Sequence, residues 1–391
     1  MKTQDTSVHI KLWHKDFWKM AIASLLLSMS VYSLVPTFPL WLAERGGQSA
    51  VWTGLGFGAF ALGMFALGGI CSYLVQRFRR NRVCILAILG VAACSLIMYY
   101  YGGGSLFSGF YGIVAIRFVQ GALFGLSKMV LASTLIIDTC ESFARTEANH
   151  SAAWFARFAV SLGPVAGLLA TTFMGSGGAW LVSAACAVMA ALLVRLVKFP
   201  FRSPGEDVRL FSSDRFFLPK GLVLFVNLAV LAAAVGLVLS LSLTVNFFGM
   251  LMGGFLLALL AQRFAFRDAE LKSEIVSGGL LMVAGLLVML TNVADSNEYF
   301  APLLFGMGVG ICASRFLLFF IKLSRHCQRG TSQSTCLLGW ETGVGLGLAV
   351  GFCVFAGAAK PVLISAVALT LTGLAMYVFY AHSWFMRNKN R

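Results

Sequence analysis

The sequence predicts an all-α integral membrane protein with 12 transmembrane helices, arranged as two pseudo-symmetric six-helix bundles. Composition and internal repetition predict this fold class. Of the 391 residues, 59% are hydrophobic and 12% are charged, and the mean hydropathy is +0.85. Such a composition excludes an ordinary soluble domain. About twelve apolar runs each approach the roughly 20 residues that a helix needs to cross a hydrocarbon core of about 30 Å.

The apolar runs predict the helices in chain order, and short polar breaks separate them. A polar stretch around Ser242–Asn246 divides runs seven and eight. The first six runs fall near 17–42, 50–75, 83–101, 109–137, 150–174 and 179–199. The second six fall near 220–240, 244–262, 275–291, 301–322, 334–358 and 361–382.

Short motifs recur at a nearly constant distance along the chain. The turn at 74–78, which contains Gln76 and Arg77, recurs 186 residues later with Gln262 and Arg263. Small residues four apart let helices approach closely, so tight packing alone explains each glycine pair. Their shared offset predicts a bundle at 1–200, a polar linker at 201–219 and a bundle at 220–391. The pairs are Gly121 and Gly125 with Gly306 and Gly310, offset 185, and Gly163 and Gly167 with Gly347 and Gly351, offset 184.

The net charge of +15 follows a membrane topology. With the N-terminus inside, 24 of the 30 Lys and Arg residues lie in predicted inner segments, and the outer loops hold only Arg45 and Lys360. We therefore expect both termini to be cytoplasmic, in a multi-pass protein of a cell membrane, with a retained first helix. The single glycosylation sequon, Asn149-His150-Ser151, falls on the cytoplasmic side, which suits a bacterial inner membrane.

Four cations lie inside apolar runs, and Glu341 is the one acid of comparable depth. Each charge at a bilayer centre costs roughly 2.5–3.5 kcal/mol, so four represent on the order of 10 kcal/mol. This imbalance predicts a polar interior that accepts anions. The four cations are Arg117, Lys128, Arg157 and Arg315.

Three motifs carry a resemblance to the major facilitator superfamily of secondary transporters, over essentially the whole chain. The sequence at 117–121, which includes Gln120 and Gly121, resembles the superfamily's RxxQG motif. The sequence at 163–167, with Gly163, Pro164 and Gly167, resembles the GPxxG core of an antiporter motif. The loop at 72–82 resembles GxxxDRxGRR, but Gln76 replaces the acid that locks the gate in relatives.

The resemblance implies two bundles that rock around a central site near the bilayer midplane. It also implies that helices 1, 4, 7 and 10 line the cavity, with helices 2, 5, 8 and 11 at the interface between the halves. Gating or structural roles follow for the matching residues: Gln76, Arg77, Gln120, Gly121, Gly163, Pro164, Gly167, Gln262 and Arg263.

Candidate substrate-binding residues are Lys128, Arg117, Arg315 and Trp340. Arg117 and Lys128 are 11 residues apart, so they differ by roughly 20° around one helix and share a face. The alternative role for Lys128 is membership of a buried structural pair. Arg117 matches a motif linked to proton coupling, and its alternative role is to bind backbone carbonyls of a neighbouring helix. Arg315 lies seven residues from Lys322, so snorkelling is its alternative. Trp340, like Trp154, stacks a substrate or a cation, or only packs.

Glu341 and Arg157 are candidates for proton coupling, together with Arg117. Glu341 and Arg157 occupy matching repeat positions, offset 184, so symmetry can bring them face to face across the interface. One interpretation is a structural salt bridge. The other is a proton-sensitive pair, in which Glu341 alternates between Arg157 and a proton.

The leading functional hypothesis is secondary transport of a small anionic or zwitterionic organic solute by alternating access, coupled to protons. The antiporter motif favours efflux, while uptake or anion exchange remains an alternative. A membrane-embedded enzyme and a non-transporting receptor are more distant alternatives, and we find no catalytic cluster. The expected partners are the solute, protons or a counter-anion, and the lipid bilayer. We expect a monomer without nucleic acid, cofactor or metal, since the histidines show no metal-binding spacing.

Overall fold

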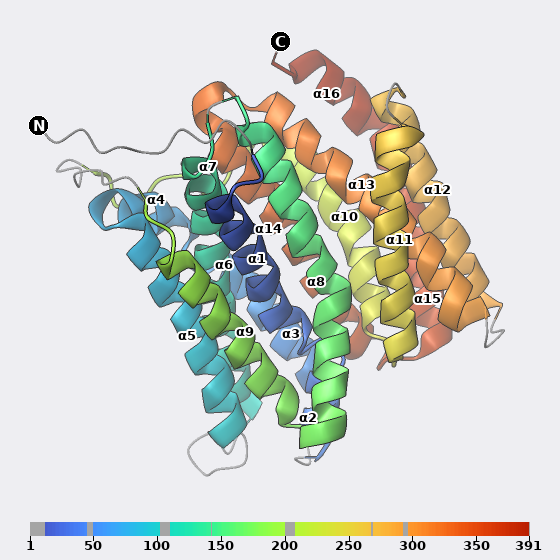
Figure 1. Cartoon of the computed structure of the whole chain (residues 1–391). Coiled ribbons are helices and arrows are strands. Elements are labelled where there is room, and N and C mark those ends of the chain that lie inside the picture. Colours follow the sequence, from blue (N-terminus) through green and yellow to red (C-terminus); the bar gives the residue numbers. More distant parts are fainter. Residues whose placement is uncertain are drawn as a thin grey trace, which may run out of the picture.

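The computed structural model describes residues 12–44, 50–101, 110–141, 143–199, 208–266, 269–291 and 296–390. Within these ranges the chain contains helices and turns but no strand. The helices run side by side as one elongated bundle, and the start of α1 and the end of α16 lie at the same end of it (Figure 1). We call this end the termini face and the other end the opposite face.

The residues up to 199 form nine of the labelled α-helices. The predicted first helix is wrong in its extent, because it is broken at Ser33–Thr37. Pro36 explains the break, since proline lacks the backbone donor and disfavours a helical residue before it. The helices are α1 (Lys15–Tyr32), α2 (Phe38–Glu44), α3 (Ala50–Ala66), α4 (Gly68–Arg77), α5 (Arg80–Tyr101), α6 (Phe110–Val130), α7 (Ile136–Asp138), α8 (Arg145–Met174) and α9 (Gly178–Arg195).

Two other predicted runs are also interrupted. The second divides into α3 and α4, which meet at an angle of 46° beside Gly68 and Gly69. Glycine weakens a helix interior and commonly marks such a kink. The fourth run passes from α6 through the π-helical turn η2 (Leu131–Leu135) into α7. Such π-helical insertions are frequent at functional sites.

The described residues after 207 form the remaining helices. The predicted split near Ser242–Asn246 is confirmed, because Thr244 begins a new helix and its hydroxyl accepts a hydrogen bond from the Phe247 amide at 3.2 Å. The elements are η3 (Pro219–Gly221), α10 (Leu222–Leu239), α11 (Val245–Phe264), α12 (Leu271–Leu290), η4 (Ser296–Phe300), α13 (Ala301–Leu323), η5 (His326–Gln328), α14 (Arg329–Cys353), α15 (Ala359–Met376), η6 (Tyr377–Ala381) and α16 (His382–Asn388).

The helical segments have the length and composition of membrane spans. Among the described residues, ten are long and apolar enough to cross a bilayer, or eleven if the bent pair α3 and α4 is one span. The first helix, α1, is not among them, and it begins with the charged residues Lys15, Asp16 and Lys19. It nevertheless packs along α8 and α9 as a member of the bundle.

The repeated glycine pairs make equivalent contacts in the two halves of the sequence. A Cβ added to Gly121 of α6 would lie 2.1 Å from the Phe60 carbonyl oxygen of α3, and one added to Gly306 of α13 would lie 2.5 Å from that of Leu251 in α11. Such distances leave no room for a side chain, so the close-packing interpretation is confirmed.

The second pair of glycine motifs repeats this relation. Gly167 of α8 packs against the Ser33 carbonyl oxygen at the end of α1, and Gly347 of α14 packs against that of Ala233 in α10. The fourth and tenth runs therefore contact the second and eighth, while the fifth and eleventh contact the first and seventh. Division of the chain into domains at 200 and 220 stays a prediction.

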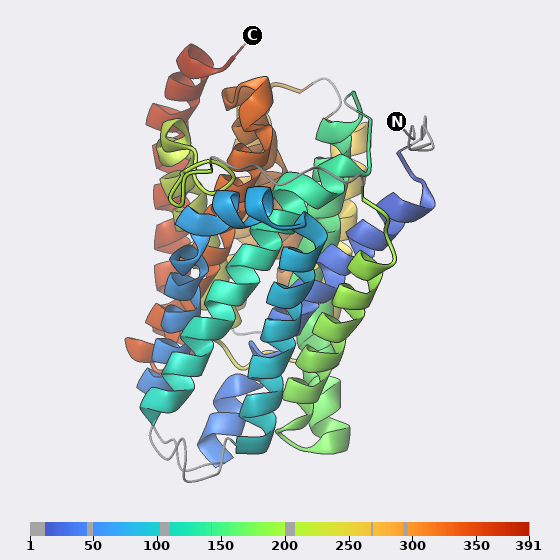
Figure 2. The ribbon, with the colours of Figure 1, turned by 90° about the vertical axis from the view of Figure 1, so that its left-hand side faces the viewer.

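The described part of the linker, from residue 208, joins helices that are distant in sequence. The Ser212 amide donates to the Gly69 carbonyl oxygen of α4 at 2.9 Å. The amides of Arg215 and Leu218 donate to the hydroxyls of Thr331 and Thr335 in α14, each at 2.8 Å. This segment therefore lies across the termini face, where α4 also lies (Figure 2).

The topology can be tested with new cysteines at two exposed residues. Ala358, between α14 and α15, lies at the opposite face, whereas Asn388 ends α16 at the termini face. The distribution of basic residues predicts cytoplasmic termini, so we expect Ala358→Cys to gain labelling by an impermeant maleimide in intact cells. Asn388→Cys should label only after permeabilisation. The native exposed Cys327 gives the background, and the reverse pattern would overturn the orientation. The same topology predicts labelling from outside at Gly47 or Ser296 and none at Ser203. Gly47 and Ser203 lie outside the described residues, and Ser296 begins η4.

Candidate functional site

A cavity lies between helices from both halves of the chain, on the side toward the termini face. Most of the lining residues lie in the half of their helix that is nearer the termini face, and Ser24 and Glu341 lie at the middle of theirs. The cavity brings together Lys128, Arg157 and Glu341, three of the charges that the sequence places inside apolar runs. The residues that mark its walls are Ser24 of α1, Lys128 of α6, Arg157 of α8, Leu228 of α10, Ala313 of α13 and Glu341 of α14.

Lys128 reaches the cavity from α6 and is 2% exposed. Its ammonium group donates to the Ser28 hydroxyl of α1 at 2.6 Å, and that hydroxyl donates in turn to the Ser24 carbonyl oxygen at 2.8 Å. The ammonium also lies 5.7 Å from the centre of the Phe124 ring. These partners are neutral, and Lys128 forms no ion pair with Glu341. The ammonium group therefore brings a positive charge to the cavity.

Glu341 projects into the same cavity from α14. Its Oε2 accepts a hydrogen bond from the Tyr32 hydroxyl of α1 at 2.9 Å, and the Trp340 indole donates to the same hydroxyl oxygen at 3.1 Å. This Trp340, Tyr32 and Glu341 chain joins α1 to α14. Sequence patterns did not identify Tyr32, because an aromatic residue inside an apolar run ordinarily only packs against its neighbours.

The predicted direct pair of Arg157 with Glu341 is not formed. Both residues line the cavity, but Arg157 places its guanidinium 4.4 Å from the centre of the Trp154 ring on its own helix. One of its terminal nitrogens, Nη1, is buried without a hydrogen-bond partner. Stacking on an aromatic ring within one helical turn satisfies part of the charge without bringing Arg157 to Glu341. Residue offsets set the helix face but not the side-chain direction.

Arg117 lies away from this cavity and is fully buried. Its guanidinium is surrounded by Phe38, Phe57 and Phe60, with distances to the ring centres of 5.3, 5.5 and 4.8 Å. Nη1 donates to the Gln120 side chain at 2.6 Å, whose amide donates to Ser95 of α5 at 3.0 Å. A role for Arg117 in substrate binding or proton coupling stays a prediction, since this conformation gives it no contact with the cavity.

Arg315 is paired with an acid that the sequence patterns missed. Its guanidinium forms a salt bridge with Glu274 of α12, which is 1% exposed. The inference that Glu341 is the one deeply placed acid is therefore wrong, because Glu274 is buried as well. The predicted run began one residue after Glu274, which is why this carboxylate was not counted. The pair neutralises Arg315 and leaves it outside the lining of the cavity.

The candidate gating loop has an arrangement that its sequence did not predict. Gln76 donates to the Ser72 hydroxyl at 2.8 Å, so it makes a bond within its own helix, and Arg77 is exposed. A carboxylate does reach the first turn of α14, but it comes from the linker. Asp214 accepts a hydrogen bond from Thr331 at 2.9 Å. In the other half, Gln262 of α11 contacts the Ser314 hydroxyl of α13.

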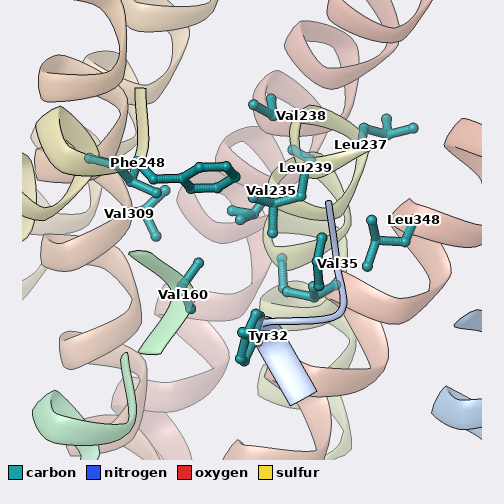
Figure 3. Packing of buried hydrophobic residues seen from close by; sticks show 14 of the residues in the cluster. Tyr32, Val35, Val160, Val235, Leu237, Val238, Leu239, Phe248, Val309 and Leu348 are labelled. Atoms are coloured by element: carbon teal, nitrogen blue, oxygen red, sulfur yellow. The ribbon is translucent and has the colours of Figure 1, made fainter. Parts of the chain in front are cut away.

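An apolar cluster closes the cavity toward the opposite face. Tyr32 marks its boundary, and the buried side chains beyond it come from helices of both halves (Figure 3). α1, α8, α10, α13 and α14 line the cavity, and each contributes an apolar residue to this plug about one or two turns farther toward the opposite face. The labelled members are Tyr32, Val35, Val160, Val235, Leu237, Val238, Leu239, Phe248, Val309 and Leu348. The described conformation is therefore sealed at the opposite face.

No metal-binding cluster accompanies the site among the described residues, where no group of three or more His, Cys, Asp or Glu side chains could hold a metal ion. Among the residues that line the cavity, only Lys128, Arg157 and Glu341 carry charged side chains.

Comparisons with known proteins find likeness in structure. No protein-family model and no curated protein sequence matches the chain. The human organic anion transporter MFSD10 (TETRAN) is 16% identical with a TM-score of 0.63, and the match covers 92% of this chain and 98% of that one. The nucleoside transporter NupG is 11% identical with a TM-score of 0.64, and the match covers 96% of this chain and 100% of that one. A bacterial homologue of the iron transporter ferroportin, in its outward-facing state, is 14% identical with a TM-score of 0.66. That match covers 94% of this chain and 100% of the other.

The fold defines a class of protein first. The chain is an all-helical protein whose many long apolar helices are those of a multi-pass membrane protein. It shares the fold of these solved transporter structures over nearly its whole length. The resemblance carried by the sequence motifs is thus confirmed at the level of fold.

Removing the Tyr32 hydroxyl tests the hydrogen-bond chain directly. Tyr32→Phe leaves the Glu341 carboxylate without its direct donor, so it should lower the free energy of unfolding by about 1–3 kcal/mol. Chemical denaturation of the purified protein in detergent measures this loss. Tyr111→Phe, at a residue that is 79% exposed, is the matched control and should change nothing. In a Glu341→Gln background the cost of Tyr32→Phe should shrink, and equal costs in both backgrounds would refute the contact.

Proposed function

We propose that this protein is a secondary active transporter that moves a small anionic or zwitterionic organic solute by alternating access. The observation that carries the proposal is the cavity between the helices of the two halves, where Lys128 and Arg157 face one carboxylate, Glu341. Two cations against one acid leave a positive balance, and an anion supplied by the solute would offset it. Transporter folds built from repeats bind their substrates between the repeats, and this cavity also lies between the two halves.

Alternating access is supported by the unequal closure of the two ends. The apolar plug around Tyr32, Phe248 and Val309 seals the opposite face, while the cavity lies on the side toward the termini face. We infer that the bundles at 1–200 and 220–391 rock about this site, so that the plug separates when the termini face closes. With the termini in the cytoplasm, the described conformation would be the inward one.

Coupling to protons is proposed to use Glu341. Its neighbours are Tyr32 and Trp340 by hydrogen bonds, with Lys128 and Arg157 on other walls of the cavity. A buried carboxylate is costly as an anion unless a cation or donor compensates it. If the rocking motion moves α1 away from α14, Glu341 loses the Tyr32 hydroxyl and becomes the natural group to accept a proton.

Efflux by proton antiport is the direction favoured by the GPxxG-like sequence on α8. Gly163 and Gly167 in that motif pack directly on the end of α1, where the plug begins. Uptake or anion exchange uses the same cavity and differs in how Glu341 is coupled. The likeness to transporters, one of which is described as an organic anion transporter, supports this class over an enzyme or a receptor.

Transport itself can be measured after a ligand screen. A thermal-shift panel of organic anions on the purified protein would select a solute, and proteoliposomes with an imposed pH gradient would then report its flux. Accumulation that collapses when the gradient is removed supports the proposal. Binding without any flux would point to a receptor instead.

Lys128→Ala should reduce flux at least tenfold, because the solute anion loses its cation partner. Expression and monodispersity should stay near those of the parent, and Lys128→Arg should retain activity only if the geometry tolerates a planar group. Lys360→Ala, at an exposed lysine on the opposite face, is the control. Normal flux in Lys128→Ala would reject its assignment.

Glu341→Gln should abolish accumulation driven by a pH gradient while leaving exchange of labelled solute measurable, because the amide mimics a permanently protonated acid. Glu274→Gln is the control for burial, since it removes a buried carboxylate paired with Arg315. That variant should lose stability but keep its coupling. If Glu341→Gln still accumulates solute in a pH-dependent manner, Glu341 does not carry the proton and anion exchange becomes the better account.

A further inference from the structure

A second cavity opens at the termini face, separate from the first in all its lining residues. Its empty volume is about 1000 Å³, including the part open to solvent. Four arginines and two aspartates line it, supplied by α5, α7, α8, α14 and the linker. They are Arg80, Arg145, Arg215, Arg329, Asp138 and Asp214.

Both aspartates already have partners. Asp138 forms an ion pair with Arg80 at 2.5 Å. Asp214 lies 3.7 Å from the Arg215 guanidinium and also accepts the hydrogen bond from Thr331. Burial and repulsion by Arg80 lower the pKa of Arg215, which reflects the crowding of positive charge here.

Arg145 and Arg329 form no ion pair with a described carboxylate. The Nε atom of each is buried and has no hydrogen-bond partner among the described residues. Both side chains are half-buried. A buried donor without an acceptor is destabilising, so two such Nε groups at one cavity require an explanation. An anion bound between them would provide acceptors for both.

The two arginines are related by the internal repeat. They are 184 residues apart, the offset that also relates Gly163 to Gly347. Arg145 is the first residue of α8 and Arg329 is the first residue of α14. Each therefore stands at the positive end of a long helix, where backbone amides also favour an anion.

Two further buried polar groups at this cavity have no partner. The Ser133 hydroxyl belongs to a residue that is 8% exposed, and the Asn149 side-chain oxygen to one that is 2% exposed. The hydroxyl can donate to an anion, and the amide oxygen can accept from a protonated one. Polar groups this deeply buried are ordinarily satisfied, so they point to a missing ligand.

We propose that Arg145 and Arg329 bind a phosphate group at the termini face, bridging the two halves of the protein. Tetrahedral oxyanions match the fork geometry of guanidinium groups and the helix N-termini behind them. The two sides already touch nearby, because a Cβ on Gly330 would lie 2.7 Å from the Ser133 carbonyl oxygen. A phosphate group held by both arginines would keep these ends together and so bias the rocking motion, independently of what the central cavity transports.

The site is tested by thermal unfolding of the full-length protein in an uncharged detergent. Inorganic phosphate is titrated against chloride at constant ionic strength, and a short-chain phosphatidic acid is compared with the corresponding phosphatidylcholine. Arg145→Gln and Arg329→Gln are the test variants, and Arg195→Gln, at an exposed arginine ending α9, is the charge-matched control. The shift relative to each variant's own phosphate-free midpoint is compared, so any loss of basal stability does not affect the result.

We expect phosphate to raise the unfolding temperature of the parent and of Arg195→Gln. The half-saturating concentration should rise at least tenfold in either test variant. If only phosphatidic acid acts, and its effect needs both arginines, the site is confirmed with a lipid headgroup as its source. An absent shift with both probes, or one of equal size in all four proteins, would overturn the proposal.

Discussion

The burial of Lys128, Arg157 and Glu341 among apolar helices is the constraint on which the rest of the structure depends. None of these charges could face lipid without a cost of roughly 2.5–3.5 kcal/mol each. Each instead has a dedicated neighbour: Ser28 for Lys128, Trp154 for Arg157 and Tyr32 for Glu341. Ser28 and Tyr32 belong to α1, and Trp154 belongs to α8. Lys128 and Arg157 therefore find these neighbours within the first half, whereas the contact of Tyr32 with Glu341 of α14 joins the two halves.

Close backbone contacts hold the helices together within each half. Gly121 and Gly306 bring equivalent helices together in the two halves, and Gly167 and Gly347 do the same one helix later. The repetition gives the two halves similar internal packing. At the termini face, the linker adds a connection that is not part of the repeat, because Asp214 accepts a hydrogen bond from Thr331 of α14. Gln76 is uncharged and bonds only within its own helix.

The sequence predicted the helices and the chemistry of the interior better than its geometry. Long apolar runs and glycine spacing are local signals, so the spans and the close contacts followed from them, except where Pro36 and Gly68 interrupt a run. The hydrogen-bond partner of Glu341 could not be predicted in this way. An offset of 184 residues relates Arg157 to Glu341 in the repeat, but it gives neither their side-chain rotamers nor the position of Tyr32 on α1. Glu274 was missed because it begins a helix outside the apolar run.

The central claim is that Glu341 changes its protonation state within a cavity that also holds Lys128. Infrared difference spectroscopy of the purified protein, titrated with acid, measures this directly through the carbonyl stretch of a protonated carboxyl group. The account predicts a band that is absent in Glu341→Gln and shifted in frequency in Tyr32→Phe, because the tyrosine hydroxyl bonds to that carboxyl group. A spectrum with every protonated-carboxyl band unchanged in Glu341→Gln would contradict it.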